Sequence, residues 1–210
     1  MTRVGFVGGT FDPIHVGHIA MAEAAAECAS LESVLLVPSN LPPHRPPAAA
    51  PAADRLAMCR LAAAGHPRLE VSDIELRRPG ASYTVDTLRA LSEERPGDEL
   101  HLVLGWDAAR AIREWRSPDD VLRMARLVIV TRPGYAPPSK ADLTAAGIDP
   151  ARAVVCDDQT PDVESTDVRR LIEEGGSLEG VLDPLVEAYL RQRRLYGAVY
   201  RPDHNAGRRA

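Results

Sequence analysis

Two histidines in a glycine-rich segment near the N-terminus are the residues best suited to chemistry. The segment reads Gly-Gly-Thr-Phe-Asp-Pro-Ile-His-Val-Gly-His over residues 8–18, so that His15 and His18 are three residues apart. Side chains with this spacing lie on one side of a helix and can face one anion. An imidazole donates a hydrogen bond to a phosphoryl oxygen, more strongly when it is protonated. The alternative is a turn in which one histidine caps the helix and the other lies at the surface, but this would not account for the whole pattern.

The backbone of the same segment also suits an anion. Gly8 and Gly9 let a ligand approach the main chain closely, and Thr10 follows them. A helix that begins near Gly17 offers unpaired N–H groups and the positive end of its dipole. The motifs GxxxxGK[ST] and GxGxxG are absent from this segment, which argues against a P-loop ATPase and against dinucleotide redox binding.

The elements that must position this segment are predicted from alternating apolar runs and helical patterns. Strands are expected at 3–8, 33–37, 69–74, 100–104, 127–130 and 153–156, and helices at 17–29, 53–64, 85–94, 106–114, 118–124, 166–174 and 181–193. Nearly continuous apolar strands separated by helices predict a parallel sheet covered on both faces. The fold class is therefore α/β, a doubly wound Rossmann-like sheet in which ligands bind beyond the carboxyl ends of the strands.

The length and composition indicate one domain. We expect a single domain over residues 1–200, a mobile Pro/Ala-rich loop at 42–53 and a flexible tail at 201–210. Lys and Arg number 25 against 30 Asp and Glu, a net charge of −5, which argues against a general nucleic-acid binder but allows a local phosphate site. The sequence contains neither a membrane-spanning run nor a secretion signal, so we expect a cytoplasmic protein that does not bind membranes.

The three cysteines, Cys28, Cys59 and Cys156, stand far apart and form no CxxC pair. An odd number of widely spaced cysteines favours reduced thiols, as in a cytoplasm. We therefore expect all three to be small buried side chains.

Segment 8–18 resembles the (H/T)xGH motif of the nucleotidyltransferase superfamily, and its longer form resembles the bacterial nicotinate-nucleotide adenylyltransferase family. Further segments match that family in order, so that the resemblance spans about residues 3–196. They are Leu41-Pro42-Pro43-His44-Arg45, Ser82-Tyr83-Thr84-Val85-Asp86-Thr87-Leu88, Gly105-Trp106-Asp107, Trp115, Arg132-Pro133-Gly134, Ser165-Thr166-Asp167-Val168-Arg169, Leu182-Asp183-Pro184-Leu185-Val186 and Leu195-Tyr196.

The resemblance implies transfer of AMP from ATP to nicotinate mononucleotide, which gives nicotinate adenine dinucleotide (deamido-NAD) and pyrophosphate in NAD biosynthesis. The implied partners are ATP and nicotinate mononucleotide, and Mg²⁺ is implied as a cofactor that bridges the ATP phosphates without a protein carboxylate cluster. No covalent intermediate is expected, and the sequence has no GxSxG nucleophile motif. The sequence leaves open whether the chain forms a homo-oligomer.

The resemblance also assigns an ATP site. His15, His18 and Arg169 are the implied catalytic residues, and Arg169 would fork onto the β- and γ-phosphates. Gly8, Gly9 and Thr10 would line the same site, Asp107 after Gly105 would accept bonds from the ribose, and Ser165 and Thr166 would complete it. Ser165 or Thr166 also suits the cap of a helix. Arg170 is the alternative to Arg169. Glu164 and Trp106 depart from the family pattern.

A second set of residues would bind the mononucleotide. Arg45, beside His44, would hold its phosphate; the alternative is an exposed basic loop. Ser82, Tyr83 and Thr84 precede a helix whose first N–H groups would receive the nicotinate carboxylate, although Ser82 or Thr84 could also be a plain cap. Trp115 would stack on the pyridine ring, or else be a half-buried core residue.

Two rival functions remain open from the sequence. One is a sister enzyme with another acceptor: nicotinamide mononucleotide, phosphopantetheine or a cytidylyltransferase substrate. The other is a non-catalytic regulator that binds a nucleotide on the same fold.

Overall fold

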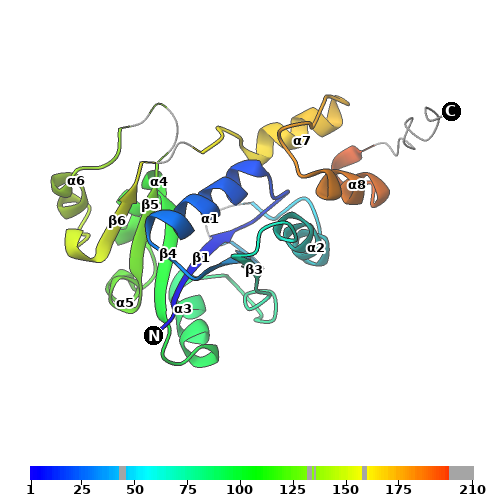
Figure 1. Cartoon of the computed structure of the whole chain (residues 1–210). Helices are drawn as coiled ribbons and strands as arrows, with labels where there is room; N and C mark the ends of the chain where they lie inside the picture. The colour runs from blue at the N-terminus through cyan, green and yellow to red at the C-terminus, as the bar shows by residue number, and fades with distance from the viewer. Residues whose placement is uncertain (43–45, 132–133, 135, 158–159, 199–210) are drawn as a thin grey trace.

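The structure, a computed structural model, describes residues 1–42, 46–131, 134, 136–157 and 160–198. Its centre is a sheet of six parallel strands in the order β3-β2-β1-β4-β5-β6 (Figure 1). The strands are β1 (Arg3–Gly9), β2 (Ser33–Pro38), β3 (Leu69–Val71), β4 (Glu99–Gly105), β5 (Arg126–Val130) and β6 (Ala153–Cys156). The strand order reverses between β1 and β4, where doubly wound sheets bind their ligands. The predicted fold class is confirmed.

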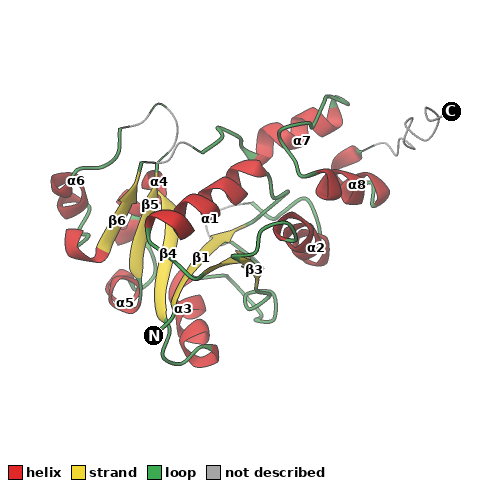
Figure 2. Ribbon diagram, viewed as in Figure 1, coloured by secondary structure: helices red, strands yellow, loops and turns green. Residues whose placement is uncertain are grey.

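Helices cover both faces of this sheet (Figure 2). They are α1 (Val16–Cys28), α2 (Ala52–Ala63), α3 (Thr84–Glu94), α4 (Trp106–Arg110), α5 (Pro118–Met124), α6 (Lys140–Ala145), α7 (Ser165–Glu173) and α8 (Pro184–Gln192), with short 3₁₀ turns η1 (Ile112–Glu114), η2 (Pro150–Arg152) and η3 (Leu195–Gly197). One buried cluster joins α1, α2, α7 and α8 to one face of the sheet, and a second joins α3, α4, α5 and α6 to the other. Successive strand residues alternate between the clusters, as Phe6 and Val7 do.

Several predicted bounds differ for local reasons. The expected helix 106–114 is divided into α4 and η1, and the expected helix 181–193 begins at Pro184 because Asp183 caps it through a 2.7 Å bond from the Leu185 N–H. The strand expected at 69–74 ends at Val71. Helix α2 begins at Ala52, which shortens the expected loop 42–53.

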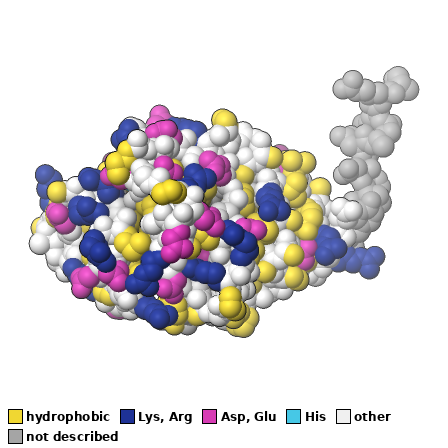
Figure 3. Space-filling model, turned by 90° about the horizontal axis from the view of Figure 1, so that it is seen from below, with side chains coloured by type: hydrophobic (Ala, Val, Ile, Leu, Met, Phe, Trp, Pro, Cys, Tyr) yellow, Lys and Arg dark blue, Asp and Glu magenta, His cyan; other side chains and the backbone are white. Residues whose placement is uncertain are grey.

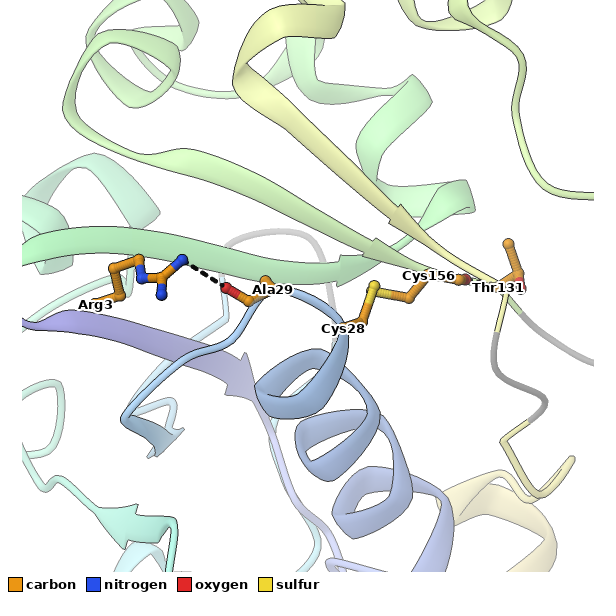
Figure 4. Close-up of a disulfide and its surroundings, with 5 residues drawn as sticks. All are labelled: Arg3, Cys28, Ala29, Thr131 and Cys156. Carbon is orange, nitrogen blue, oxygen red and sulfur yellow. Dashed lines mark hydrogen bonds between the residues drawn. A yellow bond between two sulfur atoms is a disulfide. The ribbon is translucent and has the colours of Figure 1, made fainter.

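The prediction of three reduced, buried cysteines is wrong for two of them. Cys28 and Cys156 form a disulfide that joins the last residue of α1 to the last residue of β6 (Figure 4). Cys28 is exposed, whereas Cys156 is buried. The two cysteines are 128 residues apart, so their spacing in the sequence does not predict that they pair. The fold brings their Cα atoms to 5.9 Å, a distance that a disulfide can span. Cys59 is free and buried as expected, and burial raises the pKa of its thiol to about 12.

The outer surface carries both signs of charge. Arginines pair with acidic side chains across neighbouring elements, as in Arg77–Glu94 at 2.7 Å and Arg89–Asp120 at 3.0 Å. On the face seen from below, basic and acidic side chains intermingle (Figure 3). Within the described residues, no helix has the length and apolar character that a bilayer crossing requires.

Candidate functional site

A cavity of about 860 Å³ opens where β1 and β4 end. Its wall contains every predicted site residue that the structure describes: Gly8, Gly9, Thr10, His15, His18, Ser82, Tyr83, Thr84, Gly105, Asp107, Trp115, Ser165, Thr166 and Arg169. His44 and Arg45 lie outside the described residues, as do Arg132 and Pro133. The fold thus brings four sequence segments together at the point where the strand order reverses.

The two histidines form the start of α1. His15 is the N-cap residue, and its backbone N–H donates to Nδ1 of His18 at 3.3 Å. The two ring centroids are 3.7 Å apart, and the His18 ring also meets the Phe11 ring edge-on at 5.0 Å. Because Nδ1 of His18 accepts a hydrogen bond, the proton of its neutral ring lies on Nε2. Nε2 is therefore the nitrogen of His18 that can donate to an anion.

The glycines leave room for a ligand at two strand ends. A Cβ atom added at Gly8 or at Gly105 would have no atom within 4 Å, although both residues line the cavity. At Gly17, by contrast, a Cβ would lie 3.1 Å from the carbonyl oxygen of Pro161 and 3.2 Å from Nδ1 of His15. Gly17 therefore allows α1 and the segment before α7 to approach closely.

Gly8→Ala should leave the fold intact and weaken ATP binding. The added methyl group meets nothing in the protein but enters the space where the resemblance implies the nucleotide, so we expect KM for ATP to rise about tenfold or more. Gly65→Ala is a matched control, because its Cβ also meets no atom within 4 Å and Gly65 is not in the cavity wall. Steady-state kinetics and thermal unfolding of both variants test this, and an unchanged KM in Gly8→Ala would contradict it.

The start of α7 faces the turn after β1. The expected cap by Ser165 or Thr166 is wrong: the N-cap residue is Glu164, and the Ser165 hydroxyl donates instead to the carbonyl of Pro13 at 3.0 Å. Nη1 of Arg169 donates to the carbonyl of Asp12 at 2.6 Å, which holds its guanidinium at the cavity wall. The alternative arginine, Arg170, is exposed and pairs with Asp167 at 2.9 Å.

The start of α3 forms another part of the cavity wall. Its N-cap residue is Tyr83, with no capping side-chain bond, so the plain-cap alternative for Ser82 or Thr84 is wrong. The Ser82 hydroxyl instead accepts the N–H of Asn40 at 3.0 Å, which ties this wall to the segment after β2. The guanidinium of Arg116 lies 4.6 Å from the centre of the Tyr83 ring and also lines the cavity.

The two tryptophans serve both the core and the cavity. Trp106 and Trp115 are half-buried against the apolar cluster under α3 and α5, and both also line the cavity. The two readings of Trp115, a core residue and a cavity residue, are therefore compatible. Asp107 is exposed beside them and pairs with Arg110 at 3.1 Å.

Several residues of the site and its support were not singled out from the sequence, among them Glu75, Asp12, Arg55 and Tyr196. Buried Glu75 lines the cavity and accepts the hydroxyl of Thr87 at 2.6 Å, and burial raises the pKa of its carboxyl. Asp12 belongs to the turn after β1 and lines the cavity, whereas Arg55 and Tyr196 bond to this turn from outside the cavity wall. Helix α2 contains three charged residues, Asp54, Arg55 and Arg60, so no pattern in the sequence singles out Arg55.

No metal cage is built from the protein's own side chains in the described ranges. Nowhere there do three His, Cys, Asp or Glu residues gather so that they could hold an ion. The cavity wall contains imidazole, guanidinium and backbone donors, which suit the oxygens of a phosphate chain. It also contains the acidic residues Asp12, Glu75, Asp107, Asp162 and Glu164.

Comparison with known proteins defines the class to which this fold and cavity belong. The cytidylyltransferase-like family matches residues 6–171. The solved structure of Plasmodium falciparum nicotinic acid mononucleotide adenylyltransferase, complexed with NaAD, has the same fold, with a TM-score of 0.77 and 16% identity over 96% of this chain and all of the other. The chain thus has the fold of the cytidylyltransferase-like nucleotidyltransferases.

Curated relatives narrow this class. A probable nicotinate-nucleotide adenylyltransferase of a Synechococcus species is 42% identical over 92% of this chain and 94% of its own length. That of Thermus thermophilus is 41% identical over 92% of this chain and 99% of its own length. The chain belongs to the nicotinate-nucleotide adenylyltransferase family.

Proposed function

We propose that this protein transfers AMP from ATP to nicotinate mononucleotide and releases pyrophosphate. The observation that carries the proposal is the meeting of His15, His18 and Arg169 in one cavity at the reversal of the strand order. The relatives named for the same reaction support it. We further propose that a single domain over residues 1–200 performs it.

In this proposal the triphosphate of ATP lies across the turn after β1. The Nε2–H of His18 and the imidazole of His15 donate to phosphate oxygens, and the guanidinium of Arg169 forks onto the β- and γ-phosphates. Gly8, Gly9 and Thr10 give the backbone access to the same oxygens. Asp107 accepts the ribose hydroxyls beyond Gly105. Ser165 and Thr166 line the leaving-group side.

The reaction is one displacement at phosphorus. A 5′-phosphate oxygen of nicotinate mononucleotide forms a bond to the α-phosphorus of ATP, and the bond from that phosphorus to the oxygen that bridges the α- and β-phosphates breaks. The leaving oxygen takes the electron pair, so the protein needs no covalent nucleophile. Its contribution is positioning, worth about 7–11 kcal/mol at most, and fixed donors for the charge that develops.

We propose Mg²⁺ as the accompanying ion. The donors of the cavity wall suit phosphate rather than a metal cage, so the ion would be held by ATP oxygens and water. When bound, it neutralises charge on the phosphate chain.

The start of α3 suits the acidic ring of the acceptor. The first N–H groups of α3, next to Ser82, Tyr83 and Thr84, attract a carboxylate more strongly than a carboxamide. Trp115 offers its face to the pyridinium. His44 and Arg45 remain our proposed holders of the mononucleotide phosphate.

Pyrophosphate release with each candidate acceptor tests the function. Purified protein with ATP and Mg²⁺ should release pyrophosphate with nicotinate mononucleotide and far more slowly with nicotinamide mononucleotide. Equal or greater pyrophosphate release with nicotinamide mononucleotide would indicate instead a sister enzyme with a different acceptor. ATP binding without turnover on any of the acceptors considered would instead support the regulator.

Trp115→Ala should mainly weaken the binding of nicotinate mononucleotide. Loss of a ring stacked on a pyridinium is worth about 1–2 kcal/mol, so KM for nicotinate mononucleotide should rise roughly 5–30-fold while kcat changes little. Trp115→Phe keeps an aromatic face and apolar packing, and should show a smaller rise. Steady-state kinetics with each substrate varied measures both. A rise in KM for ATP instead would mean that the ring is not at the acceptor site.

A further inference from the structure

Tyr196, near the C-terminal end of the described chain, contacts the turn after β1. Its hydroxyl donates to Oδ1 of Asp12 at 2.7 Å, across 184 residues of sequence. Tyr196 is not part of the cavity wall, whereas Asp12 is. The contact therefore reaches the phosphate cavity from behind.

Asp12 is buried and joins several segments. Its Oδ2 accepts the N–H of Ala49 at 2.6 Å, and its Oδ1 accepts the N–H of Ala50 at 3.0 Å as well as the hydroxyl of Tyr196. Its backbone carbonyl accepts Nη1 of Arg169. One residue thus links the turn after β1, the segment before α2, the arginine of α7 and the C-terminal segment.

The backbone at both ends of this contact is unusual. Tyr196 has a φ of 54°, and Phe11, the neighbour of Asp12, has a φ of 49°. Bulky side chains rarely adopt this left-handed region, and they persist there only when the surroundings fix them. Burial raises the pKa of the Tyr196 hydroxyl, and Asp12 raises it further, so the group stays a protonated donor.

We infer that Tyr196 is a positioning residue for adenylyl transfer: it fixes the Asp12 carboxylate, which holds the turn after β1 to the 49–50 backbone at the wall of the phosphate cavity. This rests on the proposed function for its kinetic consequence. Without the hydroxyl, Asp12 loses one of its three donors, and Arg169 loses a fixed partner at the carbonyl of the same residue. A small displacement of phosphate donors weakens transition-state contacts more than ground-state binding.

Tyr189 supplies a matched control. Its hydroxyl also donates to a buried aspartate at 2.7 Å, but the acceptor is Asp54 of α2, which is not in the cavity wall. Tyr196→Phe and Tyr189→Phe therefore remove the same chemical group from the same end of the chain. A merely structural role predicts similar effects for both.

Kinetics and amide exchange on the full chain test the inference. Tyr196→Phe should lower kcat about tenfold with a smaller change in the KM for either substrate, whereas Tyr189→Phe should keep the wild-type kcat. Exchange of the Ala49 and Ala50 amides should quicken about tenfold in Tyr196→Phe only. Equal kcat values, with equal exchange at Ala49 and Ala50, would overturn it.

A double-mutant cycle tests whether Tyr196 acts through Asp12. If Tyr196 acts through Asp12, the variant Asp12→Asn/Tyr196→Phe should be no slower than Asp12→Asn alone. Effects that multiply would show that Tyr196 acts independently and would overturn the link. If the wild type releases no pyrophosphate, the proposed function fails, yet the exchange rates at Ala49 and Ala50 still decide whether Tyr196 fixes Asp12.

Discussion

His18→Ala should lower kcat by roughly 10²–10³ while the protein stays folded, because the variant lacks a fixed donor to the phosphate charge of the transition state. The Nε2–H of His18 is that donor, since Nδ1 already accepts the backbone N–H of His15. The ring is held between His15 and Phe11, so it is oriented before ATP binds. Single-turnover pyrophosphate release measures the chemical step directly.

His18→Asn separates catalysis from helix capping. The Asn side chain can put an acceptor near the former Nδ1, so the His15 N–H keeps a partner, but nothing occupies the former Nε2 position. We expect His18→Asn to unfold at nearly the wild-type temperature and to turn over as slowly as His18→Ala. Recovery of kcat in His18→Asn would mean that His18 acts only as a helix cap. Near-normal turnover of His18→Ala would mean that His18 has no catalytic role.

The parts of the fold that sequence predicts are those fixed by local burial. The inner strands β1, β2, β4 and β5 are apolar runs buried on both faces, and each long helix has an apolar side against the sheet, so pattern and structure agree there. The edge strands β3 and β6 are only partly buried. Helix α6 was missed because it is a six-residue element whose one buried residue is Leu143. Such a short segment carries too little periodicity to be distinguished from a loop.

The site was predictable where its residues follow strand ends, because parallel strands bring their carboxyl ends to one edge. Gly9 and Gly105 illustrate this, since each is the last residue of its strand and both line the cavity. Contacts between distant residues were not predictable. Ser165 at a helix start suggests a cap, yet its hydroxyl prefers a carbonyl 152 residues away. The Cys28–Cys156 disulfide and the Tyr196–Asp12 bond are hidden for the same reason.

Arg55→Met should destabilise the protein by about 3–5 kcal/mol, which for a chain of this size lowers Tm by roughly 6–20 °C. Arg55 is 2% exposed; its Nη1 donates to the carbonyl of Thr10 at 2.6 Å and its Nε to that of Ala50 at 3.3 Å. Burial lowers the pKa of its guanidinium, and the nearby Asp12 carboxylate opposes that shift. The methionine fills the space but leaves two carbonyls without their donor, and it removes one cation near the buried Asp12 carboxylate, which keeps the Arg169 guanidinium at 3.9 Å.

Arg193→Met provides the comparison. Arg193 also donates to a buried carboxylate, that of Asp54 at 3.1 Å, but its side chain is 57% exposed. Water can replace the lost contact, so we expect a much smaller loss of stability than in Arg55→Met. Urea unfolding of both variants measures the difference. Since Arg55 supports Thr10 at the phosphate cavity, the folded Arg55→Met protein should also bind ATP more weakly at low temperature. Equal stability of the two variants would mean that the buried guanidinium is not what holds the turn after β1.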